Sequence, residues 1–280
     1  MQHMAQQQRR ALRADGACGI ARRASGLRGG ITGRLVEAVY ERVDAPAHGE
    51  PLRTDRLYFD FDPVLDGIPG YAWIFPYPAP GGGELWKIGV MDGRGRASGE
   101  VLRRWTADYA ERNGFRIAED KIHGWPERYY HVSTRGHRPG RVLVGEALGI
   151  DALLGEGIAP AMYSAQYAAG RLKQALDAGS QSIRGYERGF LATPEGRNLW
   201  FQAQLADMLY GRHPYRWLRV LFEMDHLQTL AGGGTDRYGR LAKHIPGLGF
   251  RYAMQVARSG LPSAAPLQRK TGVARVASHA

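Results

Sequence analysis

Hydrophobic and polar positions follow a period of two through the first third of the chain. Residues 35–39 alternate between two faces of a strand, and residues 57–61 form a second, aromatic-rich run bounded by Pro and Asp. Two further runs, 71–76 and 85–90, are separated by a Gly- and Pro-rich loop and therefore predict a hairpin. We predict an antiparallel sheet between residues 31 and 91.

Other segments repeat their apolar residues every three to four positions. Ser98 is a good N-cap for a helix over 98–113, which Gly114 ends. The Thr-Pro-Glu at 193–195 is a typical helix start. Four helices are predicted after it, two strong and two weaker: 194–210, 215–231, and those that begin at Arg237 and Phe250.

Within the stretch 141–169 the hydrophobic pattern changes from that of a strand to that of a helix. An apolar strand at 142–144 runs through a glycine-rich turn into a helix that starts near Pro160. Four glycines let a ligand approach the backbone: Gly145, Gly149, Gly155 and Gly157. The helix start at 158–161 offers free N–H groups and a positive dipole end. Glu146 can accept hydrogen bonds from sugar or ribityl hydroxyls. Together, these features predict a binding site for a flat, polyanionic ligand. The alternative is a plain strand-turn-helix connection without a ligand.

A shorter turn lies near the start of the chain. Asp15-Gly16 is a strong turn signal after a short strand, and Arg22-Arg23 follow on one helical turn. From the residues alone, a surface turn in a basic leader is the simpler interpretation.

The formal net charge of +11 is unevenly distributed. Residues 1–30 hold six arginines and one acidic residue, and residues 251–280 hold five basic residues and no acidic one. The basicity therefore belongs to the two ends, and no nucleic-acid-binding face is predicted. Ser, Ala, Pro, Lys and Arg dominate residues 259–280, which we predict to be a disordered tail.

Several classes of site find no support in the sequence. The single cysteine, Cys18, excludes an intrachain disulfide and fits a reducing compartment. The nine histidines are scattered without a metal-binding spacing, so no metal site is predicted. We expect a cytoplasmic protein, because there is neither an apolar run long enough for a transmembrane helix nor a signal peptide.

Both glycine-containing turns resemble FAD-binding motifs of a flavoprotein group that includes geranylgeranyl reductases, aromatic hydroxylases and flavin-dependent halogenases. Asp15-Gly16, then Gly19 and Arg22, resembles an Ala-Asp-Gly motif that lies close to the FAD diphosphate and, in some members, a pyridine nucleotide. Segment 145–158 resembles the second motif, where a Gly-Asp pair holds the ribityl chain and a Gly-x-Gly lies against the flavin ring. The resemblance implies eight FAD-binding residues: Asp15, Gly16, Arg22, Gly145, Glu146, Gly155, Gly157 and Ile158.

The sequence also departs from the family pattern. Four residues replace the usual ones: Glu146 for Asp, Ala152 for Pro, Gly19 for Ser and Arg13 for Gly. Intact members begin with a Rossmann strand-turn-helix that carries Gly-x-Gly-x-x-Gly, a unit of about 30 residues with no counterpart before Asp15. We therefore expect this chain to correspond to the later part of such a flavoprotein, as a truncated or split form.

An aromatic string in the predicted hairpin carries a third resemblance. Tyr71, Trp73 and Phe75 share one face of a strand, which on spacing alone favours plain sheet core. With Pro76 they form Tyr-x-Trp-x-Phe-Pro, similar to a geranylgeranyl reductase motif that lines the substrate cavity beside the flavin. The resemblance implies that these four residues bind substrate. Pro69 is two residues before the tyrosine, where the family pattern has three.

Together these patterns predict an α+β fold with an antiparallel-sheet substrate domain, a partial α/β FAD-binding domain and C-terminal helices. Five segments are expected: 1–30, a remnant of the FAD-binding domain; 31–140, the substrate domain; 141–190, the second FAD motif and its helix; 191–258, the helical region; and 259–280, the tail.

The implied function is that of an FAD-dependent oxidoreductase that reduces isoprenoid carbon–carbon double bonds by hydride transfer from reduced flavin. NAD(P)H or another electron donor would reduce the flavin. The expected ligand is an isoprenoid or other hydrophobic small molecule, with peripheral membrane contact through apolar surface. Two alternatives remain: a flavin-dependent hydroxylase or halogenase of an aromatic substrate, and a non-catalytic remnant that binds a lipid or a partner without flavin.

Overall fold

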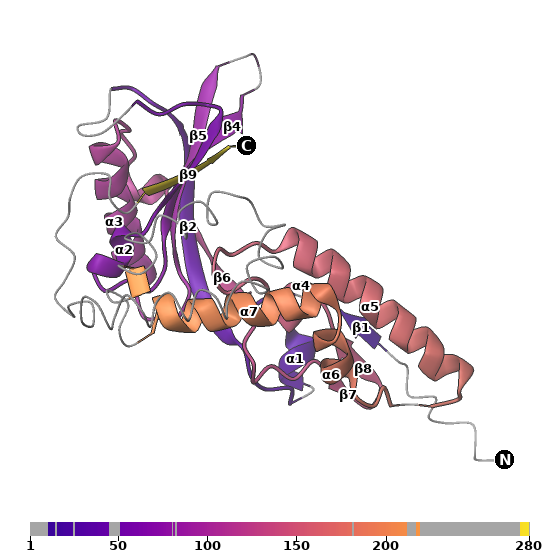
Figure 1. Ribbon diagram of the computed structural model, residues 1–280. Coiled ribbons are helices and arrows are strands. Elements are labelled where there is room, and N and C mark those ends of the chain that lie inside the picture. The colour runs from indigo at the N-terminus through magenta and orange to yellow at the C-terminus, as the bar shows by residue number, and fades with distance from the viewer. Residues whose placement is uncertain are drawn as a thin grey trace, which may run out of the picture. The chain divides into compact units, whose positions relative to one another are not determined.

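A computed structural model describes residues 11–14, 16–24, 26–44, 51–79, 81, 83–180, 182–211 and 217–218, together with the backbone of 275–279 (Figure 1). The chain divides into two compact units. Unit 1 comprises residues 1–32 and 127–203, and unit 2 comprises residues 33–126 and 204–280.

Unit 2 is built around a six-stranded sheet. From one edge to the other its strands are β6 (His123–Tyr129), β2 (Ile31–Glu41), β5 (Glu84–Asp92), β4 (Ala72–Pro78), β3 (Arg56–Asp60) and β9 (Arg275–His279). The pairings from β2 through to β9 are antiparallel, and β4 and β5 form the predicted hairpin. Strand β9 lies within the segment predicted to be disordered, and its five residues pair with β3 instead.

Helix α3 (Gly99–Arg112) covers one face of this sheet (Figure 1). Ser98 caps it as predicted, because its side chain accepts a hydrogen bond from the Val101 N–H at 3.2 Å. The core between helix and sheet consists of buried side chains from both: Val36, Ala38, Ile74, Trp86, Ile88 and Val90 from the strands, and Leu102, Tyr109 and Ala110 from α3. Two short helices, α2 (Asp62–Leu65) and η1 (Glu119–Lys121), also belong to this unit.

Unit 1 contains a three-stranded sheet in the order β1 (Ala11–Arg13), β8 (Arg141–Leu143), β7 (His137–Arg138). Strands β1 and β8 are parallel, whereas β7 and β8 are antiparallel. The long helix α5 (Ile158–Asp177) packs on this sheet through a small core that includes Val142, Val144 and Ala168. Four shorter helices also occur here: α1 (Ile20–Ala24), α4 (Gly145–Leu148), α6 (Tyr186–Leu191) and α7 (Pro194–Leu209). The residues of α7 are shared between the two units.

These elements confirm the predicted α+β class and several of the predicted strands and helices. The predicted strand at 142–144 is β8, and the helix predicted near Pro160 begins at Ile158. The single turn α4 inside the glycine-rich segment was not predicted. The helices predicted from residue 215 onward lie outside the described residues, except for 217–218.

Candidate functional site

The two predicted FAD motifs meet in unit 1. Gly16 follows β1, and Gly145 and Glu146 follow β8, its parallel neighbour in the sheet. Carboxyl ends of parallel strands lie at one edge of a sheet, so the two turns come side by side. A Cβ on Gly16 would lie 3.5 Å from Glu146 Oε2, and both glycines have positive φ, 71° and 57°. Asp15, the carboxylate of the first motif, lies outside the described residues.

A buried serine ties the second motif to α5. The Gly145 N–H donates to Ser164 Oγ at 2.9 Å, and that hydroxyl donates to the Ala161 carbonyl at 3.1 Å. A Cβ on Gly145 would lie 3.4 Å from the Ala161 Cβ, so the turn sits directly against the helix. Ser164 is 1% exposed. Sequence reasoning missed it, because a serine on a helix carries no signal of what its hydroxyl contacts.

The start of α5 offers fewer free N–H groups than the sequence predicted. The Ala159 N–H donates to Glu156 Oε1 at 2.9 Å, and Pro160 has no N–H. Ala161 begins the intrahelical hydrogen bonds, so within 158–161 only Ile158 keeps an N–H without a partner among the described residues. The Glu156 carboxylate also lies at the positive end of the helix dipole. This helix start is therefore already partly neutralised by the chain itself.

A second carboxylate is buried inside the glycine-rich turn. Asp151 is 0% exposed, and its oxygens accept hydrogen bonds from the Leu153 N–H at 2.7 Å and the Leu154 N–H at 3.1 Å. Burial raises the pKa of Asp151 to about 7, and the charge of Glu156 adds to this, although the two N–H donors oppose it. Asp151 therefore holds the turn in shape and titrates near neutral pH, a role that the sequence did not reveal.

Arg128, another residue that sequence reasoning missed, adjoins Glu146. Its backbone N–H donates to Glu146 Oε1 at 3.3 Å. Its guanidinium donates to Thr32 Oγ1 at 3.3 Å and to the Gly29 carbonyl. Burial, together with the charge of Arg22 in α1, lowers the pKa of Arg128 to about 10. Glu146 and Arg128 therefore lie together at the junction of the two motifs.

Comparisons with known proteins add little to this geometry. No protein-family profile matches the chain, and no curated protein sequence matches it. Several solved structures resemble it distantly, and two of them are described here. A geranylgeranyl bacteriochlorophyll reductase-like protein from Thermoplasma acidophilum is 19% identical, with a TM-score of 0.45, over 68% of this chain and 51% of that one. The OxyS anhydrotetracycline hydroxylase from Streptomyces rimosus is 16% identical, with a TM-score of 0.34, over 91% of this chain and 47% of that one.

The chain thus spans about half the length of each of these structures. Both TM-scores lie below 0.5, so neither match decides a fold or an activity for this chain.

The predicted substrate residues form a row of touching rings in unit 2. The ring centroids are 5.7 Å apart for Tyr71 and Trp73 and 6.3 Å apart for Trp73 and Phe75. Phe59 of the neighbouring strand contacts Tyr71 and Phe75, with centroids 5.5 and 5.1 Å apart. Tyr71 and Trp73 are buried, whereas Phe75 and Pro76 are half-buried. The three aromatic residues therefore share a face, as the alternation predicted.

Gly89 makes room for this aromatic row. It lies opposite Trp73 in the β4–β5 pairing, and a Cβ there would overlap the Trp73 ring and the Val36 carbonyl. The indole can therefore lie flat across the neighbouring strand, which no larger residue at position 89 would permit.

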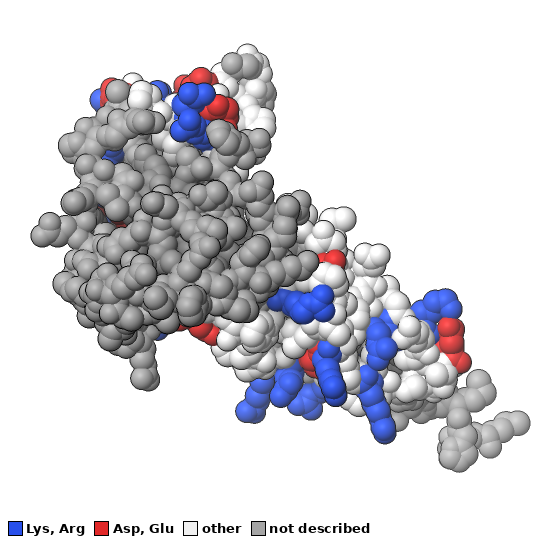
Figure 2. All heavy atoms as spheres, in the orientation of Figure 1, with Lys and Arg blue, Asp and Glu red and all other residues white. Residues whose placement is uncertain are grey.

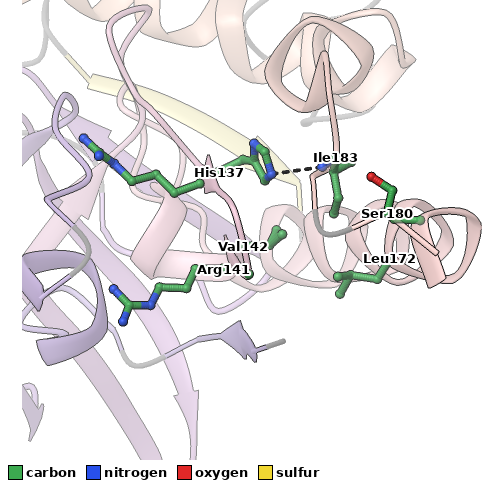
Figure 3. Close-up of a pocket in the computed structure, with 9 residues that line it drawn as sticks. His137, Arg141, Val142, Leu172, Ser180 and Ile183 are labelled. Atoms are coloured by element: carbon green, nitrogen blue, oxygen red, sulfur yellow. Dashed lines mark hydrogen bonds between the residues drawn. The ribbon is translucent and has the colours of Figure 1, made fainter. Parts of the chain in front are cut away.

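A small pocket in unit 1 contains none of the predicted site residues (Figure 3). It lies between the β7–β8 hairpin and the C-terminal half of α5, where His137 faces Ile183. His137 Nε2 accepts a hydrogen bond from the Ile183 N–H at 3.1 Å, which requires a neutral ring with its proton on Nδ1. Burial lowers the pKa of His137 and favours that neutral form. We interpret this histidine as structural.

The described residues offer neither a metal site nor a membrane-spanning helix. Figure 2 shows several separate Lys and Arg side chains on the described surface of unit 1, among larger areas of uncharged residues. Within the described residues there is no group of three His, Cys, Asp or Glu side chains that could hold a metal ion. Nor does the described part of the chain contain a helix with the length and apolarity to span a membrane.

Proposed function

We propose that this chain binds FAD through unit 1 and acts as a flavin-dependent oxidoreductase. The observation that supports this best is the adjacency of the Gly16 turn and the Gly145-Glu146 turn, which are about 130 residues apart in the sequence. An extended dinucleotide needs backbone approach points at both its ribityl chain and its diphosphate. Two glycine turns at one sheet edge meet that need.

The residues at this junction fit the polar parts of a flavin. Glu146 is half-buried and accepts one hydrogen bond, from the Arg128 N–H, so its carboxylate keeps acceptor sites for ribityl hydroxyls. At the start of α5 the Ile158 N–H has no partner among the described residues and is available as a donor. Gly155, with φ of 71°, and Gly157 would leave the backbone accessible to the flat ring. Arg22 would face the diphosphate.

We further propose that the reaction is the reduction of isoprenoid carbon–carbon double bonds, with NAD(P)H or another donor reducing the flavin. When bound, reduced FAD supplies the hydride that adds to one alkene carbon, and a proton adds to the other. The chain would bind the apolar substrate along Tyr71, Trp73 and Phe75, with Pro76 at the end of the row. Large rings of this kind exclude water and restrict the substrate's orientation.

The start of α5 supports contact with an apolar substrate reservoir. Ile158, Met162 and Tyr163 are 79%, 67% and 46% exposed, although all three are large apolar side chains. Apolar groups clustered on one helical turn favour peripheral association with a membrane surface, where isoprenoids partition. We therefore propose a cytoplasmic enzyme that works at the membrane interface on a hydrophobic small molecule.

Flavin titration of the purified chain tests the first proposal. We expect FAD to bind, with its absorption bands perturbed, and Glu146→Gln to weaken binding about tenfold because an ionised acceptor is lost. Glu111→Gln on the exposed face of α3 serves as the matched control and should bind FAD as the wild type does. A wild-type chain that leaves FAD unperturbed would rule out the proposed cofactor.

Turnover with chemically reduced flavin tests the substrate proposal. Mass spectrometry should detect the gain of two hydrogens when geranylgeranyl diphosphate is supplied, and Trp73→Ala should abolish it. Trp125→Ala, which removes an indole that is 51% exposed, is the control and should leave turnover intact. Oxygenation of an aromatic compound without alkene reduction would instead favour the hydroxylase alternative.

A further inference from the structure

Two segments of unit 1, residues 16–28 and 130–145, contain six arginines and no acidic residue. One of the six, Arg22, is half-buried and belongs to the proposed cofactor site. The other five are exposed: Arg23, Arg28, Arg135, Arg138 and Arg141. We refer to these five as the exposed arginines. Their charge is therefore not balanced within the segments that carry them.

Hydrogen bonds hold the two segments against each other. Arg138 Nη2 donates to the Gly26 carbonyl at 3.1 Å, although 112 residues separate the two in the sequence. Arg141 Nη1 donates to the carbonyl of the last residue of α1 at 3.2 Å. The Arg135 N–H donates to the Arg28 carbonyl at 2.9 Å. The exposed arginines of both segments therefore belong to one surface of unit 1.

Carboxylates from other segments contact this part of unit 1 at less exposed positions. Glu187 of α6 accepts the N–H groups of Gly136 and His137 at 3.1 and 3.2 Å. Glu146 Oε2 would lie 3.5 Å from a Cβ on Gly16. Both carboxylates are half-buried, whereas the arginines are exposed. A surface of exposed cations attracts a negatively charged partner.

Exposed apolar side chains in the same segments indicate what kind of anion this is. Ile20, in α1, is 75% exposed, and Val132 is 44% exposed. Surfaces that bind membranes combine such residues with cations, because the apolar groups enter the acyl boundary while the cations meet anionic headgroups. Nucleic-acid surfaces often add aromatic rings on which bases stack. The only Phe, Tyr or Trp of the two segments, Tyr130, is 4% exposed.

The spacing of the charges also favours a lipid surface over one small anion. Figure 2 shows separate Lys and Arg side chains on the described surface of unit 1, with uncharged residues between them. A single phosphate group is held by donors that converge on it, whereas anionic lipids lie side by side over a plane. Separate cations on one surface suit the second kind of partner.

We propose that the exposed arginines, with Ile20 and Val132, form a docking surface for anionic lipid headgroups. Each cation near such a membrane strengthens attachment, and salt weakens it by screening. The inference deepens the membrane contact proposed for the start of α5 and rests on that part of the proposed function. It adds a second surface and a required lipid charge, and it needs neither flavin nor substrate.

Co-sedimentation of the full chain with lipid vesicles tests the surface. We expect binding to vesicles of equimolar phosphatidylcholine and phosphatidylglycerol at low salt. Binding to phosphatidylcholine alone should be weaker by about tenfold or more, because the cations then meet no net charge. Added sodium chloride should weaken binding to the anionic vesicles. Equal binding to both kinds of vesicle, or binding to neither, would overturn the proposal.

A double variant, Arg28→Gln with Arg135→Gln, tests the arginines themselves. Both side chains are exposed and make no hydrogen bond through their guanidinium groups within the described residues, so the fold should tolerate the change. Affinity for the anionic vesicles should fall about tenfold or more. Arg96→Gln with Arg116→Gln, at exposed positions of unit 2, removes the same charge and should bind as the wild type does. Equal losses in the two double variants would overturn the proposal.

Ile20→Ser tests the apolar part of the surface. The side chain is 75% exposed, so its removal should cost the fold little and weaken binding to the anionic vesicles several-fold. Val101→Ser, at a position of α3 that is 50% exposed, is the matched control and should leave binding unchanged. Equal affinities for these two variants would show that Ile20 does not enter the membrane.

Further measurements separate this inference from the proposed function and from a nucleic-acid partner. If Met162→Ser abolishes vesicle binding and the Arg28/Arg135 double variant does not, the membrane contact of α5 survives and this inference is wrong. If the double variant loses vesicle binding in a chain that leaves FAD unperturbed, the docking surface stands and the flavin function fails. If a single-stranded oligonucleotide binds through the same two arginines and anionic vesicles do not bind, the partner is a nucleic acid and the proposal is overturned.

Discussion

Arg94 in unit 2 and Arg128 in unit 1 are two largely buried arginines in opposite surroundings. The Arg94 side chain is 9% exposed, and its Nη2 lies 2.7 Å from Asp207 Oδ1. Its Cζ also lies 5.9 Å from the centroid of the Tyr210 ring. Arg128 is 2% exposed, and the charge that acts on its pKa is that of another arginine, Arg22.

The same physical effect therefore has different consequences in the two units. Burial lowers the pKa of both arginines, but Asp207 opposes this shift at Arg94, whereas Arg22 increases it at Arg128. Asp207 neutralises Arg94, so this ion pair contributes to the stability of the fold. Among the described residues no carboxylate forms an ion pair with Arg128, so the two arginines differ in whether the described part of the fold neutralises them.

The largest effect is expected from a substitution at Gly149, which packs against the backbone next to the strand that contains Arg128. Gly149 has φ of 130°, and a Cβ there would lie 2.6 Å from Tyr130 backbone atoms, at the end of the strand that contains Arg128. Gly149→Ala should therefore lower the free energy of unfolding by about 2 to 4 kcal/mol in chemical denaturation. Gly170→Ala, at an open helical position, should instead raise it by about 0.5 to 1 kcal/mol. Equal effects would show that the approach of Gly149 to Tyr130 is not tight.

A smaller effect concerns the pH dependence of the glycine-rich turn in unit 1. Asp151 has a pKa of about 7 in the folded chain, against an ordinary value of 3.8, so the folded state binds the extra proton between those values. Its contribution to stability is greatest below about pH 4 and is lost as the pH rises through 7. The free energy of unfolding of the wild type, relative to Asp151→Asn, should fall by at most about 4 kcal/mol between pH 4 and pH 8. A flat difference would mean that Asp151 stays ionised.

The smallest effect compares the two arginines directly. Asp207→Asn leaves Arg94 without its ion-pair partner and should destabilise the chain by about 1 kcal/mol, a modest value because Asp207 is 41% exposed. Arg22→Gln relieves Arg128 of a like charge and should be neutral or stabilising by a few tenths of a kcal/mol. Denaturation at low salt measures both. If Arg22→Gln is the more destabilising of the two, Arg22 belongs to the fold and the contrast fails.

Much of the fold was predictable because it depends on local patterns. Alternation at 35–39 and 71–76 identified strands of unit 2, and the Ser98 cap and the Gly114 stop bounded α3 correctly. The glycine-rich stretch gave β8 and α5 within two residues of their observed ends. These signals succeed because a strand or helix buries one face, and that face recurs with a fixed period.

The candidate site was only partly predictable. Gly16, Gly145 and Glu146 were selected as one site from their motifs, and the parallel pairing of β1 and β8 brings their turns together. Arg128 and Ser164 were not selected. Nothing in the residues next to an arginine or a serine says which distant carbonyl, hydroxyl or carboxylate it will contact.

The sequence by itself determined where strands, helices and glycine turns form, because those depend on spacing and on backbone freedom within a few residues. Only the tertiary structure decided which charges are neutralised. Arg94 forms an ion pair with a carboxylate, whereas Arg128 is affected by the charge of another arginine. In the sequence, both are ordinary basic residues. The physical reason is that desolvation and Coulomb energy depend on distances across the fold, which no local pattern of residues contains.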